Sequence, residues 1–208
     1  MADATTIAGI LLVAGPVAGA IPIAHPGLLR VWSAPREQYL AMIGAHRRAW
    51  YALNAGFAVA TLATAAGLAV LAVDAGLKTM RGELLLAITV AYALGGSPWL
   101  AMLAIRSARD PLLADMLADG RTTEPAEALL GAATAGLFAS FVLITGATLV
   151  ALSAVLWFGG VVAPLIAAIA GLVAVVVLAV QLRSGDCIPA ILYVPTVLVG
   201  IALLAGWT

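Results

Sequence analysis

The residues best suited to chemistry form a charged run, GAHRRAWY at residues 44–51, at the start of a long apolar segment. The imidazole of His46 can exchange a proton near neutral pH, and the guanidinium of Arg47 or Arg48 can bind a phosphate or carboxylate through paired hydrogen bonds. The same run is also typical of a helix that enters a membrane, with cations toward lipid phosphates and aromatic rings at the headgroup level. Two interpretations therefore stay open for these three residues: an anchor that sets topology, or contacts with a headgroup or substrate anion.

A second group of candidates is weakly polar and lies inside the apolar segments. Gly95–Trp99 reads GGSPW, and we expect a break in its helix there because Pro98 removes a backbone donor. With the orientation given below, these residues all fall in the cytoplasmic half of the membrane. Their clustering there predicts a pocket that is open to the cytoplasmic leaflet and binds a lipid-like or small apolar ligand. The alternative is that these side chains only join helices by hydrogen bonds. The group consists of Asn54, Ser97, Trp99, Gln181 and Tyr193.

Charged residues and histidines are absent from the central part of every apolar segment. Ion-coupled transporters, proton pumps and voltage sensors need such groups within the membrane, so these functions are disfavoured. The single cysteine, Cys187, excludes an internal disulfide and a cysteine-based zinc site. A haem held by His25 and His46 is disfavoured because His25 precedes Pro-Gly in a loop. The sequence therefore predicts no metal and no cofactor.

Catalysis on a lipid or isoprenoid substrate is the second functional hypothesis. His46 would act with an acid at the inner membrane edge, for which Glu37, Asp110 and Asp186 are candidates. No GxSxG, HExxH or P-loop pattern occurs in the chain.

The elements that position these residues follow from the composition. The chain has 208 residues, of which 64% are hydrophobic and 10% are charged, and its mean hydropathy is +1.13. Such values predict an all-α integral membrane bundle, because a spanning helix needs about 20 apolar residues. We expect one transmembrane domain over residues 1–208 with six helices, at about 5–24, 50–73, 84–105, 127–158, 161–182 and 189–207.

The distribution of arginine and lysine predicts the orientation of the bundle. The loops on one side carry eight of these residues, and those on the other carry only Lys78 and Arg81. The positive-inside rule therefore predicts that both termini lie on the outer side of a bacterial inner membrane. For a chain embedded in that membrane, lipids are the expected partners. The formal net charge is zero, which gives no reason to expect nucleic acid. The eight residues are Arg30, Arg36, Arg47, Arg48, Arg106, Arg109, Arg121 and Arg183.

Two connections have helical patterns of their own. Ser33–Glu37 predicts a helix start, with no breaker before the second spanning helix, so that helix is expected to begin in the cytoplasm. Asp110–Gly120 predicts a short amphipathic helix at the membrane interface, opened by Pro111. The fourth apolar window is too long for one crossing, and we expect it to tilt or to project from the membrane.

Small residues recur at four-residue spacing, as in Gly15 with Gly19, Gly136 with Ser140, and Ala167 with Gly171. Such pairs let helices approach closely, either within one chain or in a homodimer. They also leave open a third hypothesis, an accessory subunit that binds another membrane protein.

One stretch resembles a known pattern. Residues 43–70, with the preceding 25–42, resemble a pattern in small multi-helix bacterial membrane proteins of unknown function, in which a His-Arg-Arg-x-Trp run enters a helix rich in small residues. The resemblance supports the topology and implies no activity.

Overall fold

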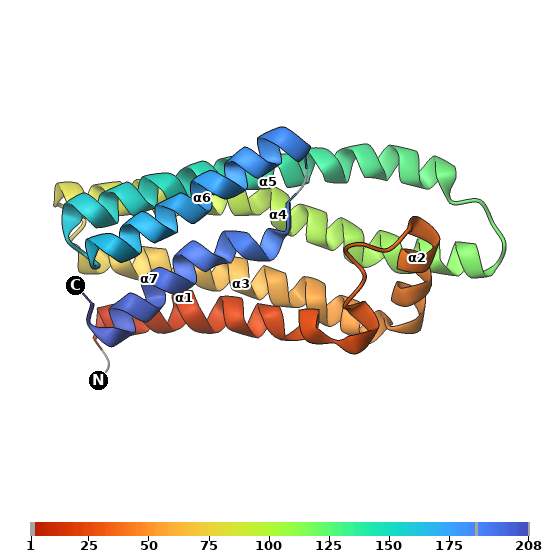
Figure 1. Ribbon diagram of the computed structural model, residues 1–208, viewed down its shortest axis with the longest axis horizontal. Coiled ribbons are helices and arrows are strands. Elements are labelled where there is room, and N and C mark those ends of the chain that lie inside the picture. Colours follow the sequence, from red (N-terminus) through yellow and green to blue (C-terminus); the bar gives the residue numbers. More distant parts are fainter. Residues whose placement is uncertain (1–2, 186, 208) are drawn as a thin grey trace.

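The computed structural model in Figure 1 is an elongated bundle of helices packed side by side. It describes residues 3–185 and 187–207, without the side chains of 125–127 and 129. No strand occurs within these ranges. The elements are α1 (Ala4–Ala20), η1 (Ile21–Ala24), η2 (Pro26–Leu28), α2 (Arg36–Ala45), α3 (Arg47–Asp74), α4 (Met80–Ala118), α5 (Glu124–Gly159), α6 (Pro164–Ser184), η3 (Pro189–Tyr193) and α7 (Val194–Ala205), where η marks a 3₁₀ helix.

Five of the described helices are long and apolar enough to cross a membrane, namely α1 with η1, α3, α4, α5 and α6. The chain is therefore an all-α, multi-pass membrane protein, as its composition predicts. The sixth apolar window folds differently from the others, as the 3₁₀ helix η3 followed by the 12-residue α7. Both termini lie at the same end of the bundle, and α2 lies at the other end (Figure 1).

α4 is one uninterrupted helix of 39 residues, and this corrects two predictions. The expected break at Gly95–Trp99 does not form, and the expected separate helix at Asp110–Gly120 is the last part of α4. Pro98 removes only the hydrogen bond to the carbonyl of residue 94, while the glycines before it pack directly against α3 and α5. Packing against α3 and α5 therefore keeps the helix continuous through Pro98.

The start of the second spanning helix is also different from the prediction. A single helix from the Ser33 region was expected, but α2 ends at Ala45 and α3 begins at Arg47. His46 between them leaves the helical region, with φ −126° and ψ 41°. Its ring packs onto Gly27, where even a Cβ atom would clash. Docking of His46 against the η2 loop thus sets the corner between α2 and α3.

The small-residue pairs divide into two kinds. Gly19 of α1 packs against the backbone of Gly56 in α3, and Gly171 of α6 packs against Ser153 of α5. These close approaches are internal packing. Gly136 is exposed and has no atom within 4 Å of the position its Cβ would take, while Ser140 is half-buried and donates only to the Gly136 carbonyl, so α5 faces outward at Gly136.

α4 and α5 are longer than the hydrocarbon layer of a bilayer. At 1.5 Å per residue, the 39 residues of α4 span roughly 58 Å, against roughly 30 Å of hydrocarbon. Figure 1 shows both helices continuing past the end of α6, and α2 packs against the protruding part of α4. The prediction that the fourth window extends beyond one crossing is consistent with the 36 residues of α5.

Candidate functional site: a cavity with two arginines

A cavity of about 1000 Å³ lies toward the α2 end, beside the last turns of α6. The α5 wall is one helix face, formed by Gly131, Thr134, Ala135 and Phe138 at spacings of three and four residues. The α6 wall is formed in the same way by a face that extends from Leu172 to Val180. Another side is closed by Gly185, Cys187 and Ile188, which follow α6, and by Pro189 and Ile191 of η3. The walls are therefore mainly aliphatic, and Gly131 and Ala135 leave room because they are small.

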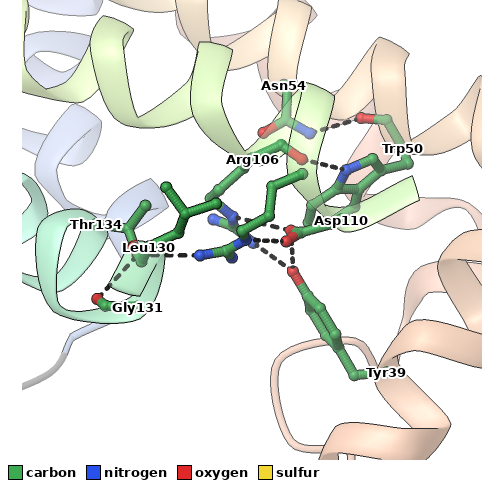
Figure 2. Close-up of polar contacts among 9 residues, drawn as sticks. Tyr39, Trp50, Asn54, Arg106, Asp110, Leu130, Gly131 and Thr134 are labelled. Atoms are coloured by element: carbon green, nitrogen blue, oxygen red, sulfur yellow. Dashed lines mark hydrogen bonds and ion pairs between the residues drawn. The ribbon is translucent and has the colours of Figure 1, made fainter. Parts of the chain in front are cut away.

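Two arginines of α4, Arg106 and Arg109, line the same cavity. Asp110 lies between them and is fully buried, while the arginine side chains are only 12% and 10% exposed. The Nε of Arg109 donates to Oδ1 of Asp110 at 2.7 Å, and the Nε of Arg106 lies 3.8 Å from Oδ2 (Figure 2). Arg109 also donates from Nη1 to the Thr134 hydroxyl at 3.2 Å, which joins α4 to α5.

Arg106 is held by aromatic rings as well. Its guanidinium carbon lies 4.8 Å from the ring centroid of Trp50 and 5.3 Å from that of Trp32. Contacts at this distance attract a cation to the face of the ring. The indole N–H of Trp50 donates to the backbone carbonyl of Arg106 at 3.4 Å, which fixes the same turn of α4.

Tyr39 of α2 completes the cluster. Its hydroxyl donates to Oδ2 of Asp110 at 2.5 Å and accepts a hydrogen bond from Nη2 of Arg106 at 3.4 Å. Burial raises the pKa of this hydroxyl to about 12; the charge of Arg106 opposes the shift, and the Asp110 carboxylate adds to it. Tyr39 is therefore a neutral donor at physiological pH.

The five residues Tyr39, Arg106, Arg109, Asp110 and Thr134, which we call the arginine cluster, carry two positive charges and one negative charge. Of the five N–H groups of Arg109, two are used by Asp110 and Thr134, and the described residues provide no partner for the other three. A net positive charge at the edge of an apolar cavity favours an anion, because a desolvated charge without a counter-charge is costly.

The predicted pocket residues lie elsewhere. The indole N–H of Trp99 donates to the Tyr193 hydroxyl at 3.1 Å, and that hydroxyl also contacts Thr61 of α3 at 2.7 Å. Trp99 is fully buried and stacks on Phe141. These contacts form a packed junction of α3, α4, α5 and η3.

The other three pocket candidates are separate from this junction. Asn54 donates within its own helix to the Trp50 carbonyl, and Ser97 is exposed and bonds back to Ala93. Gln181 is buried and donates to the Gly185 carbonyl, while its side-chain oxygen has no partner among the described atoms. None of the five predicted pocket residues lines the large cavity, and their role in binding stays a prediction.

The charged run at residues 46–48 lies outside the cavity too. Arg47 forms an ion pair with Asp115 near the end of α4, and both side chains are substantially exposed. The ring of His46 lies 5.3 Å from that of His25, and Arg48 is exposed.

Among the proposed acid partners of His46, Asp110 belongs to the arginine cluster, Glu37 is exposed, and Asp186 lies outside the described residues. The described residues contain no group of three or more metal-ligating side chains.

Because the third predicted apolar window ends at residue 105, it places Arg106 and Arg109 in a loop. Their spacing of three, with Asp110 next to the second, was a usable signal, since residues three apart share a helix face. Their burial depends on where α2, α5 and α6 pack, which no local pattern indicates.

The fold and the cavity define a helical, multi-pass membrane protein with an amphipathic cavity. No protein-family model, curated protein or solved structure matches the chain.

Proposed function

We propose that this protein binds a lipid-like or small apolar ligand in the cavity between α4, α5 and α6. The observation that carries the proposal is a mainly aliphatic cavity of about 1000 Å³ within a membrane protein. Ligand cavities usually have volumes of about 300 to 1000 Å³ and combine apolar walls with a few polar groups. This cavity has that composition.

The α6 wall supports a ligand that comes from the bilayer. Leu172, Val176 and Val180 are 64%, 51% and 45% exposed, so the wall is open to the surroundings of the bundle. Aliphatic side chains exposed on a membrane helix face lipid. From Leu172 to Val180 the wall runs for roughly 12 Å along the helix axis, which accommodates part of an alkyl chain.

We further propose that the chain crosses a bacterial inner membrane six times, with the α2 end in the cytoplasm. The apparent sixth crossing would consist of η3 and α7, which together are shorter than the other spans. An even number of crossings is supported by the two termini, which lie at one end of the bundle (Figure 1). The ligand cavity would then open toward the cytoplasmic leaflet.

The arginine cluster disfavours Asp110 as the acid partner of His46 in the enzyme alternative. Both carboxylate oxygens of Asp110 already accept hydrogen bonds, from Tyr39 and Arg109, and the carboxylate also forms an ion pair with Arg106. A carboxylate held in this way orients its neighbours rather than abstracting a proton. His46 does not line the cavity.

Native mass spectrometry with retained lipids tests the proposal. Val176→Trp should fill the cavity and reduce the mass of co-purified ligand. Val175→Trp is the matched control, because Val175 is 50% exposed on the same helix but does not line the cavity. Equal ligand occupancy in both variants, or no bound ligand in the wild type, would reject the proposal.

A further inference from the structure

We infer that the cavity selects an amphiphile with a single anionic headgroup, which Arg109 and Arg106 bind while the apolar chain lies along α6. This inference rests on the proposed function and adds the chemical class of the ligand. It predicts preference for a lipid phosphate or carboxylate over a neutral lipid of the same chain length.

The first argument is the position of the charges. Arg106 and Arg109 lie on successive turns of α4, and both line the cavity together with Thr134 and Gly131 of α5. The aliphatic part of the lining comes mainly from the other side, from α6. The cavity therefore has a cationic part and an apolar part. An anionic amphiphile is complementary to both, with its headgroup in the cationic part and its chain in the apolar part.

The second argument is that the arginines are preorganised. Asp110 fixes Arg109 at 2.7 Å through Nε, and Thr134 fixes it again through Nη1. Trp32 and Trp50 hold Arg106. Side chains already restrained lose little conformational entropy when a ligand binds, so their remaining N–H groups can bind oxygen atoms at low cost.

The third argument is the charge balance. Asp110 offsets only one of the two guanidinium charges, and the arginine side chains are nearly as buried as the carboxylate. A phosphate or carboxylate headgroup supplies the missing negative charge and accepts several hydrogen bonds at once. A neutral headgroup such as a glycerol hydroxyl supplies no charge and would leave the site positive.

The test compares two lipids that differ only in the headgroup, dioleoyl phosphatidic acid and dioleoylglycerol. Purified protein in neutral detergent is titrated with each lipid, and the bound fraction is counted by native mass spectrometry. We expect half-saturation at a concentration about tenfold or more lower for phosphatidic acid, the size expected for a hydrogen bond to a charged group. Equal midpoints would overturn the inference, including the case in which a carboxylate of the chain itself neutralises the arginines.

Variants assign the preference to the cluster. Arg109→Gln should abolish the difference between the two lipids while dioleoylglycerol still binds, which shows that the cavity is intact. The control is Arg81→Gln at the opposite end, where Arg81 donates to the Gly159 carbonyl, and it should keep the full preference. An unchanged preference in Arg109→Gln would overturn the assignment.

Competition with inorganic phosphate distinguishes a site for a lipid headgroup from a site for a free soluble anion. If the ligand is an amphiphile, millimolar phosphate alone should not displace bound phosphatidic acid. Displacement at that concentration would make the site one for a soluble anion and overturn the inference. Failure of the proposed function looks different, because then neither lipid binds or Val176→Trp leaves the binding of both unchanged.

Discussion

The hydroxyl of Tyr39 in α2 donates a 2.5 Å hydrogen bond to the buried carboxylate of Asp110 in α4, 71 positions later in the chain. Through this bond a short helix outside the apolar windows is tied to the arginines that line the cavity. The position of α2 and the geometry of the arginine cluster therefore depend on each other.

We expect Tyr39→Phe to destabilise the protein by about 1.5–3 kcal/mol, the usual contribution of a hydrogen bond to a charged group. The ring would stay packed against Trp50, so the change isolates the hydroxyl. Thermal unfolding in detergent measures the effect. Tyr51→Phe is the control, because Tyr51 is 47% exposed in α3. Equal melting temperatures for the two variants would contradict the role given to this bond.

Asp110→Asn should be more damaging, with a loss of about 3–5 kcal/mol, because it leaves two nearly buried arginines without their counter-charge. Asp115→Asn provides the comparison, since it removes a carboxylate from an exposed ion pair with Arg47 and should change stability little. The free energy of unfolding of both variants would be measured in the same detergent. Comparable losses would show that burial of the cluster is not what makes Asp110 important.

The raised pKa of Tyr39 predicts a dependence on pH. The folded state holds the phenolic proton more tightly than the unfolded state, in which the pKa is near 10. This contribution to stability is complete below pH 10 and is lost as the pH rises toward 12. The difference in melting temperature between the wild type and Tyr39→Phe should therefore shrink across this window. A constant difference would show that Tyr39 titrates normally.

Close packing between α1 and α3 can be tested at glycine. In Gly19→Ala the new Cβ would lie 2.6 Å from the Gly56 carbonyl oxygen, and backbone cannot move aside cheaply. A loss of about 1–3 kcal/mol is expected. Gly136→Ala adds the same methyl group where nothing lies within 4 Å. It should be neutral in a monomer, whereas a shift in the monomer–dimer equilibrium would reveal a dimer face on α5.

Orientation can be tested with single cysteines in a Cys187→Ser background. Leu77→Cys lies in the α3–α4 connection and Thr122→Cys in the α4–α5 connection, and both positions are exposed. If the α2 end is cytoplasmic, a membrane-impermeant thiol reagent added to spheroplasts should label only Leu77→Cys. Labelling of Thr122→Cys alone would invert the topology.

The helical segments could be predicted from the sequence because their signal is local. A run of about 20 apolar residues has one stable form in lipid, whatever its neighbours are. The predictions were wrong where the local structure depends on packing against other helices. Pro98 and Pro111 look like breaks but lie inside α4, because α2, α3 and α5 pack along it. His46 looks like part of a continuous helix but is the corner, because its ring docks on Gly27.

The site shows the same limit. Their predicted depth in the membrane places Trp99 and Tyr193 in one group, and the two side chains do form a hydrogen bond, but within a packed junction. From the sequence, Arg106 and Arg109 contribute only to the predicted orientation. Both arginines are buried beside residues of α5 and residues 187–191, which line the same cavity. This arrangement arises only when distant segments assemble.

The protruding part of the bundle has a core of its own. Leu40, Leu113 and Ala114 form a small apolar cluster between α2 and α4, apart from the main core. A segment held by few apolar contacts can open without global unfolding. Amide hydrogens in α2 should therefore exchange with solvent sooner than those in the middle of α3. Because Tyr39 packs against both cores, each such opening would also release its hydrogen bonds to Asp110 and Arg106, so local opening of α2 would leave the cluster held by α4 and α5 alone.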